Sequence, residues 1–107
     1  MILVTCDDVP GRRIRRTCGL VRGSAVRARS LPRDIMALLR MLVGGEIPEY
    51  TKAMAETREQ ALDRMVDQAR ELGADAVVAV RFVSAELIGG AAELTVYGTA
   101  VVLEPDR

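Results

Sequence analysis

The chain has 107 residues, of which half are hydrophobic and only three are aromatic, and its 15 basic and 15 acidic residues cancel to a formal net charge of zero. This length predicts a single domain, residues 1–107, with a hydrophobic core of its own. No apolar run is long enough for a membrane-spanning helix, and the N-terminus lacks the basic start and apolar stretch of a signal peptide. We therefore expect a cytoplasmic protein in which Cys6 and Cys18 are reduced.

The zero net charge hides an uneven distribution of charge along the chain. Residues 11–40 contain nine arginines and one aspartate, whereas residues 41–107 contain six basic and twelve acidic residues. A basic segment of this kind can bind nucleic acid, or it can meet the acidic half of the same subunit or of a neighbour. We favour the second interpretation, because no aromatic residue lies among the arginines to stack on bases.

The first predicted elements are two strands. A short apolar run at residues 2–5 is too short to be stable alone, so it needs an edge of its own sheet or of another subunit. After a turn, residues 14–29 predict a long strand. Gly19 and Gly23 within it indicate a bend, a bulge or a close approach of another backbone. Alternation places side chains on two faces, with Cys18, Leu20 and Val26 on one and Val21 and Ala25 on the other.

Two helices are predicted next. Ser30 is a plausible N-cap of a short helix that ends at Gly44-Gly45. A longer helix follows, with Pro48 in its first turn and Gly73 in the left-handed conformation after its last turn. Its apolar face repeats with helical spacing and consists of Tyr50, Met54, Ala61, Leu62, Met65, Val66, Ala69 and Leu72.

Two strands at residues 74–87 and 92–103 complete the chain, joined by a hairpin turn at Gly89-Gly90. The last strand has a polar face made of Glu93, Thr95, Tyr97 and Thr99. The strand before it is apolar on both faces and should be covered on both, by the long helix on one and by the short helix or a second subunit on the other. Alternation places Ala76, Val78, Val80 and Phe82 on one of its faces, and Val77, Ala79, Arg81 and Val83 on the other.

The predicted fold class is α+β, with the element order β-β-α-α-β-β. The connection from strand 14–29 to strand 74–87 is long enough for a right-handed parallel crossover. Strand 92–103 can then lie between these two strands, antiparallel to both. The expected result is a two-layer unit, in which a three-stranded mixed core sheet packs against one long helix.

Several short blocks occur in an order that resembles a known family. The blocks are Cys18-Gly19-Leu20-Val21-Arg22-Gly23, Val43-Gly44-Gly45-Glu46-Ile47, Tyr50, residues 69–78 and Tyr97-Gly98-Thr99-Ala100-Val101. Each block alone is unspecific, but together they resemble the YbjQ-like family of small bacterial proteins, whose members often carry a heavy-metal-binding label. The resemblance implies a dodecin-like sandwich unit assembled as a homopentamer, with short extra strands helping assembly, and no established biochemical activity.

The residues offer little catalytic or metal-binding chemistry. The chain has no histidine, and its two thiols, Cys6 and Cys18, are twelve residues apart. One subunit therefore lacks the three or four nitrogen and sulfur ligands of a zinc or soft-metal site. No pair of residues suggests a nucleophile with its base. We expect no enzyme activity, no catalytic, metal-binding or cofactor-binding residues, and no cofactor.

Two further features have structural interpretations. Gly44-Gly45-Glu46 precedes a helix, as a phosphate-binding turn does, but the carboxylate of Glu46 would repel phosphate. A tight connection between helices is the favoured interpretation. Arg81 lies within an apolar strand, and we expect it to pair with a carboxylate across a subunit interface or, as the alternative, to line a polar pocket there.

The sequence as a whole favours a homo-oligomeric structural or small-ligand-binding module, pentameric by resemblance. Its expected partner is another copy of itself, its small-molecule ligand is left open, and neither nucleic acid nor a membrane is expected. The alternative is a metal- or anion-binding protein that uses sites between subunits. Oligomerisation is predicted from the short strand at residues 2–5 and from apolar surface at Val77, Ala79 and Val83.

Overall fold

A computed structural model describes residues 1–27, 48–86 and 91–105, with the side chains of the long helix described from residue 54 onward. The elements are β1 (Ile2–Leu3), β2 (Ile14–Arg27), α2 (Pro48–Glu71), β3 (Ala76–Glu86) and β4 (Ala92–Leu103). The predicted short helix, the turn at Gly44-Gly45-Glu46 and the turn at Gly89-Gly90 lie outside the described residues.

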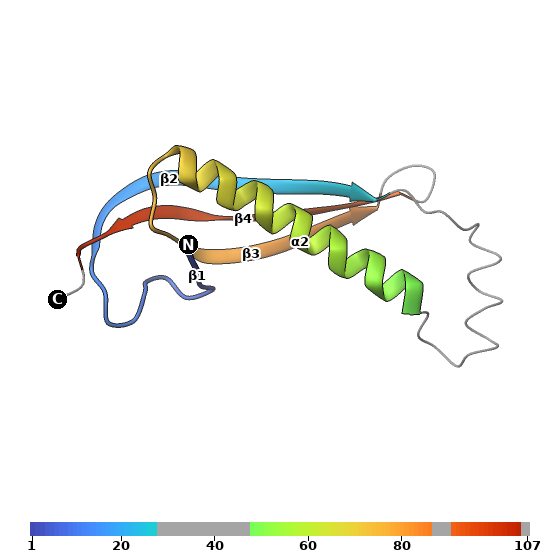
Figure 1. Cartoon of the computed structure of the whole chain (residues 1–107), viewed down its shortest axis with the longest axis horizontal. Helices are drawn as coiled ribbons and strands as arrows, with labels where there is room; N and C mark the ends of the chain where they lie inside the picture. The colour runs from blue at the N-terminus through green and yellow to red at the C-terminus, as the bar shows by residue number, and fades with distance from the viewer. Residues whose placement is uncertain (28–47, 87–90, 106–107) are drawn as a thin grey trace.

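Within the described residues the strands form one four-stranded sheet in the order β1-β3-β4-β2 (Figure 1). β4 lies between β3 and β2 and is antiparallel to both, as predicted, so β2 and β3 run parallel to each other. The prediction of three strands was wrong, because β1 adds a fourth strand that pairs parallel with β3. The short apolar run at the N-terminus thus pairs with an edge strand of its own subunit, β3.

The helix α2 lies across one face of the sheet (Figure 1) and packs mainly over β2 and β4. Its buried stripe consists of Ala61, Met65 and Ala69, which recur every four residues and are fully buried. The helix begins at Pro48, and Gly73 follows it with a φ of 77°, so both predicted end signals are confirmed. Leu72 was predicted on the buried face but is exposed, because it follows the last helical residue.

Gly23 allows the helix to approach β2 closely. A Cβ atom at this position would clash with the carbonyl oxygen of Ala61 and would lie 2.5 Å from the amide nitrogen of Met65. Gly98 in β4 leaves room for the neighbouring strand β3, since a Cβ there would lie 2.6 Å from Cγ1 of Val77. The close backbone approach predicted at Gly23 is therefore confirmed.

The core has two parts, one on each face of the sheet. The part beneath α2 consists of Val21, Ala25, Ala61, Met65, Ala69, Val77, Val80, Val96 and Ala100. The smaller part, on the opposite face, consists of Val9, Ala76, Val78, Val101 and Leu103. Here the segment between β1 and β2 places Val9 over the sheet. The second face of β3 is thus covered over its first half by the N-terminal segment of the same chain, which the sequence did not predict. Cover by the short helix or by a second subunit stays a prediction.

A β-bulge in β3 overturns the predicted faces of that strand. The register with β4 shifts between Val78 and Arg81, and Ala79 has a φ of 54°. One inserted residue moves all later side chains to the other face. Val77 and Val80 consequently both face α2, and Val77 is fully buried rather than exposed at an interface.

A second irregularity, in β2, confirms the predicted bulge and corrects one side chain. The register shifts between Thr17 and Gly19, and Gly19 has a φ of 129°. Cys18 therefore packs against the core beneath α2, and its Sγ donates to the carbonyl oxygen of Leu72 over 3.8 Å. Strict alternation predicted that Cys18 shares a face with Leu20, and this prediction was wrong.

Candidate interaction surface

The face of the sheet opposite α2 is covered by Val9 and its neighbours at one end only. Beyond that end, no described residue lies over it as a second layer. The strand register places the following residues in this open face: Leu20, Arg22, Ser24 and Val26 of β2; Arg81, Val83 and Ala85 of β3; Glu93, Thr95, Tyr97 and Thr99 of β4. The polar face predicted for the last strand is confirmed as part of it.

Four hydrophobic side chains of the open face are exposed to solvent. The exposed fraction is 70% for Leu20, 56% for Val26 and 51% for Val83, and Tyr97 is also exposed. They come from all three long strands, so they form a surface rather than isolated contacts. Apolar patches of this kind, bordered by polar groups, usually mark an interaction surface.

The centre of the open face carries a line of hydrogen-bonding groups. The hydroxyl oxygens of Ser24 and Thr95, which face each other across β2 and β4, lie 2.9 Å apart. The Thr95 hydroxyl donates to Oε1 of Glu93 over 3.3 Å. This chain of contacts holds the carboxylate of Glu93 along the sheet surface.

Next to this line, two arginines flank a phenol. Arg22 and Arg81 are both register partners of Tyr97, on either side of it. Directly opposed residues in a sheet have Cβ atoms about 5 Å apart, so the three side chains form one row. The row combines two cationic donors with a hydroxyl group, which is a donor set suited to an anion.

Arg81 also fixes the N-terminal segment. Its Nη1 donates to the carbonyl oxygens of Thr5, over 2.7 Å, and of Val80, over 2.9 Å. No contact between Arg81 and a carboxylate is present among the described residues. The pairing with a carboxylate of another subunit stays a prediction.

The outer edge of β2 is covered by α2 in its second half. The backbone N–H of Arg22 donates to Oε1 of Gln68 over 2.7 Å, and Nη1 of Arg64 donates to the carbonyl oxygen of Ser24. Side chains of α2 thus occupy the backbone groups with which another strand would pair. No described residue occupies the outer edge of β2 between Ile14 and Leu20 in this way.

The outer edge of β3 is covered in its first half. Val4 donates its N–H to Val77 and accepts from Val80, both over 3.0 Å, and Ala79 donates to the carbonyl oxygen of Cys6 over 2.8 Å. Beyond Arg81, β3 pairs with β4 alone among the described residues.

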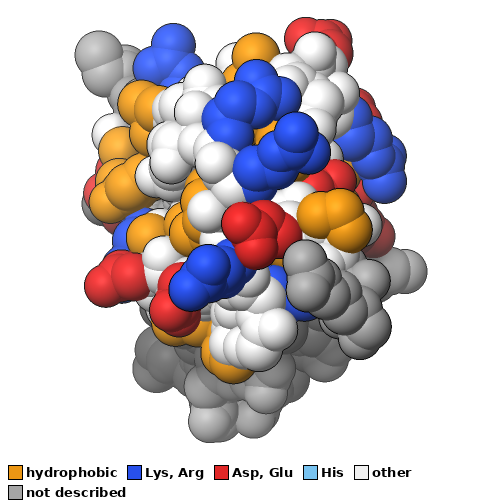
Figure 2. All heavy atoms as spheres, turned by 90° about the vertical axis from the view of Figure 1, so that its left-hand side faces the viewer, with side chains coloured by type: hydrophobic (Ala, Val, Ile, Leu, Met, Phe, Trp, Pro, Cys, Tyr) orange, Lys and Arg blue, Asp and Glu red, His pale blue; other side chains and the backbone are white. Residues whose placement is uncertain are grey.

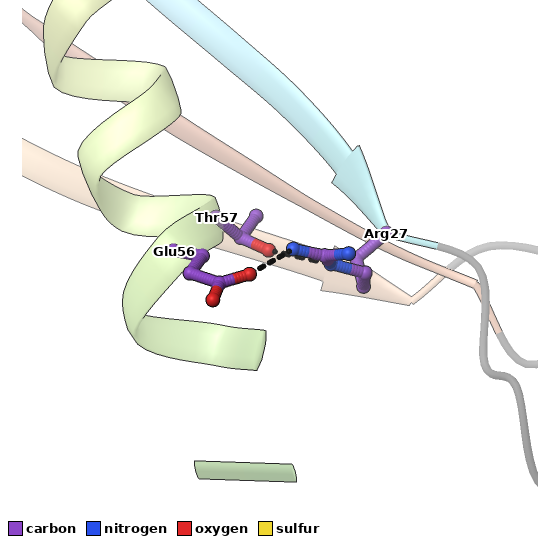
Figure 3. Close-up of polar contacts among 3 residues, drawn as sticks. All are labelled: Arg27, Glu56 and Thr57. Carbon is purple, nitrogen blue, oxygen red and sulfur yellow. Dashed lines mark hydrogen bonds and ion pairs between the residues drawn. The ribbon is translucent and has the colours of Figure 1, made fainter. Parts of the chain in front are cut away.

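Charge contacts within the chain join β2 to α2. Nη2 of Arg27 lies 3.3 Å from Oε2 of Glu56, and its Nε donates to the buried hydroxyl of Thr57 over 3.1 Å (Figure 3). At this contact one arginine of the basic segment meets a carboxylate of the acidic half of the same subunit. Whether the other arginines do so stays a prediction. At the end of the sheet where β2 begins, blue basic side chains gather in the upper half of the surface (Figure 2).

The structure does not bring the two thiols together. Cys6 is exposed, beside the outer edge of β3, and its Sγ lies 3.0 Å from the carbonyl oxygen of Asp8. Cys18 lies on β2, at the other side of the sheet. In the part of the chain that the structure describes, no three His, Cys, Asp or Glu side chains are grouped as metal ligands would be. The same part contains no helix that is long and apolar enough to cross a membrane.

Residues 1–104 match the model of the YbjQ family, which is described as "Putative heavy-metal-binding". The chain belongs to the YbjQ family. It is 56% identical to a UPF0145 protein of Pyrococcus abyssi and 51% identical to one of Thermus thermophilus, over 107 residues that make up all of this chain and 94% of each relative. A UPF0145 protein of Methanosarcina acetivorans is 50% identical over 101 residues, 94% of this chain and 95% of that one.

A solved structure has the same fold as this member of the YbjQ family. It is the crystal structure of a protein of Pediococcus pentosaceus, described as having unknown function and belonging to the DUF74 family. The TM-score is 0.63 at 15% sequence identity, with 97% of this chain and 98% of that one covered. At this identity the likeness shows the fold alone.

Sequence reasoning found half of the open face in this YbjQ-family chain. The alternation of residues 92–103 identified the polar face of β4 correctly. It missed Arg22 and Arg81 as neighbours of Tyr97, because this row depends on the register of three strands and on a bulge. The row could have been predicted only from knowing that Tyr97 pairs with both arginines across the sheet. A single sequence does not give this information.

Proposed function

We propose that this YbjQ-family chain is a homo-oligomeric module without catalytic chemistry, whose subunits associate through the open face and hold a small ligand at their interfaces. The proposal includes a dodecin-like unit, a ring of five subunits and a cytoplasmic location. The number five comes from the family resemblance.

The observation that carries the proposal is the exposure of Leu20, Val26 and Val83 on one sheet face. Because 51–70% of each side chain is exposed, full burial of each would stabilise an assembly by on the order of 1–2 kcal/mol. These three residues come from both outer strands of the core sheet and lie on a single face. Stable monomers rarely expose an apolar patch of this kind to water. A second copy of the chain would remove them from water.

The test compares two charged substitutions on different faces. Leu20→Asp combined with Val83→Asp should give a folded protein of lower mass in sedimentation velocity, because both carboxylates would be buried at the interface. Gln60→Asp, an exposed position on α2, is the matched control and should keep the mass of the parent protein. If the double variant sediments as the parent does, the open face is not the interface.

The second candidate function is anion binding at the row of Arg22, Tyr97 and Arg81. Two guanidinium groups beside a phenol favour an anion over a metal cation. The probe is inorganic phosphate, titrated into the assembled protein by calorimetry. Arg22→Gln should abolish the heat of binding without changing the subunit number, and equal binding by this variant would exclude the row as the site.

A further inference from the structure

Arg81 lies on the open face because of the β-bulge at Ala79. Val77 faces α2, and without the inserted residue Arg81, four residues later, would face α2 as well. With the bulge, Arg81 instead shares the open face with its register partner Tyr97. Ala79 has a φ of 54°, a left-handed conformation that costs free energy in most residues with a Cβ atom. Neighbouring contacts must therefore hold the bulge in place.

The N-terminal segment, residues 1–13, supplies such contacts. The N–H of Ala79 donates to the carbonyl oxygen of Cys6 over 2.8 Å. The next N–H along the strand, that of Val80, donates to the carbonyl oxygen of Val4 over 3.0 Å. The docked segment therefore stabilises the bulge that places the following arginine on the open face.

The same segment also orients the guanidinium group of Arg81. Nη1 of Arg81 donates to the carbonyl oxygens of Thr5, over 2.7 Å, and of Val80, over 2.9 Å, which uses both N–H groups of this nitrogen. Among the described residues, Nε and Nη2 have no hydrogen-bond partner. They form the other edge of the guanidinium fork, and their N–H groups match two oxygen atoms of one anion. Arg81 can therefore hold the segment and an anion at the same time.

The row itself is not neutralised by a carboxylate of the described residues. Neither Arg22 nor Arg81 belongs to an ion pair there. The described part of the open face has one carboxylate, that of Glu93, which accepts from Thr95. Glu93 lies four residues from Tyr97 along β4, about 13 Å away. An anion at the row therefore meets two positive charges without a competing carboxylate from the same face.

We propose that the N-terminal segment is part of the anion site, and that the docked segment and the bound anion stabilise each other. The anion, held by Arg22, Tyr97 and the Nε–Nη2 edge of Arg81, fixes the guanidinium group whose Nη1 holds the segment. Coupling between two sites is reciprocal, so the docked segment in turn favours the anion. The ligand class is a small oxyanion such as phosphate. The inference rests on the proposed anion binding and adds how the site is built and what it controls.

The experiment measures amide hydrogen exchange by NMR in the full, assembled protein, with and without inorganic phosphate. The reporters are the amides of Ala79 and Val80, which bond to the N-terminal segment. The control is the amide of Ala74, which bonds to Ala69 at the end of α2. Saturating phosphate should slow exchange at both reporters about five-fold or more, as a typical coupling between sites does, and should leave the control unchanged. Sodium chloride at equal ionic strength should have no effect.

Two substitutions separate binding from coupling. Arg22 lies on β2, at the other side of the sheet from the N-terminal segment. Arg22→Gln should therefore lose phosphate binding and the slowing of exchange, while its exchange without phosphate stays as in the parent. Arg81→Lys keeps the positive charge but has no second edge. Phosphate should bind this variant more weakly and no longer slow exchange at the reporters.

The reciprocal effect is measured as phosphate affinity. Val9 packs over Val78 and Val101 rather than over the row, and Val9→Ser should loosen the segment. We expect phosphate to bind this variant about five-fold more weakly than the parent. Thr17→Ala, at an exposed position of β2, is the control and should bind phosphate as the parent does. Should Val9→Ser fail to fold, Val9→Ala takes its place and is interpreted in the same way.

The outcomes distinguish the inference from the anion-binding proposal. If phosphate binds the parent and not Arg22→Gln, but leaves both reporters unchanged, the inference is overturned and anion binding stands. The same holds for a Val9 variant whose reporters exchange faster while its phosphate affinity equals that of the parent. No phosphate binding by the parent, or equal binding by Arg22→Gln, overturns the anion-binding proposal and the inference with it.

Discussion

Gly23 of β2 lies directly beneath the backbone of Ala61 in α2. No side chain fits between them, so the helix and the strand touch through their main chains. This contact brings Gln68 and Arg64 of α2 to the outer edge of β2, where they bond to the backbone. The position of one glycine thereby decides which half of β2 remains open to a partner.

Gly23→Ala should therefore destabilise the protein. The added methyl group forces α2 away from β2, and overpacking of this kind costs about 1–3 kcal/mol. Urea unfolding at a fixed protein concentration measures the change. Thr17→Ala, on an exposed position of the same strand, is the control and should change the free energy of unfolding little. A Gly23→Ala variant as stable as the control would show that the helix can lie further from the strand.

Gly73→Val tests the end of α2. Gly73 has a φ of 77°, and a Cβ atom there would meet no other atom within 4 Å, so its effect is purely one of backbone conformation. The β-branched residue should cost on the order of 1–3 kcal/mol. Gly73→Asn is the matched variant, because asparagine tolerates left-handed backbone, and it should cost clearly less. Equal stability of the two variants would argue against the left-handed conformation.

Val9→Ser tests the N-terminal segment as the cover of the second core. Val9 is buried against Ala76, Val78 and Val101, and its loss should cost about 2 kcal/mol. Hydrogen exchange at the amides of Ala79 and Val80 should accelerate, because residues 4–6 bond to them. Asp8→Ser, at the exposed neighbouring position, should leave both measurements unchanged. Unchanged exchange in Val9→Ser would show that the segment is held by its hydrogen bonds alone.

The positions of the strands and of α2 could be predicted from the sequence, because periodicity and end signals act locally. Gly73 and Pro48 mark the ends of α2, and the alternation of residues 92–103 fits a strand with one polar face. The order of the three long strands could also be predicted. A long crossover between β2 and β3 and a hairpin between β3 and β4 allow only a few strand orders.

The assignment of side chains to the two faces of the sheet could not be predicted as well, because it depends on the bulges in β2 and β3. Gly19 gives a visible signal for the irregularity in β2, but Ala79 has no local feature that indicates a φ of 54°. The single residue inserted there moves Val77 into the core with Val80 and leaves Val83 on the open face. Val77→Asp, which strict alternation suggests as a way to break assembly, would instead place a charge in the core beneath α2.

The family description as heavy-metal-binding leads to a prediction about the thiols. In the described part of one subunit, Cys6 and Cys18 belong to no group of three candidate ligands. Zinc titrated into the parent protein should give no tight stoichiometric binding, and Cys6→Ser combined with Cys18→Ala should behave identically. Tight zinc binding by the parent protein that this variant loses would contradict the prediction.

The central claim is that the chain assembles with itself through the uncovered parts of its sheet. Sedimentation equilibrium of the unmodified protein at micromolar concentration measures this most directly. We predict one oligomeric species of defined mass, five times the 11.6 kDa of the chain if the resemblance also gives the subunit number. A well-folded species with the mass of a single chain across this concentration range would contradict the claim.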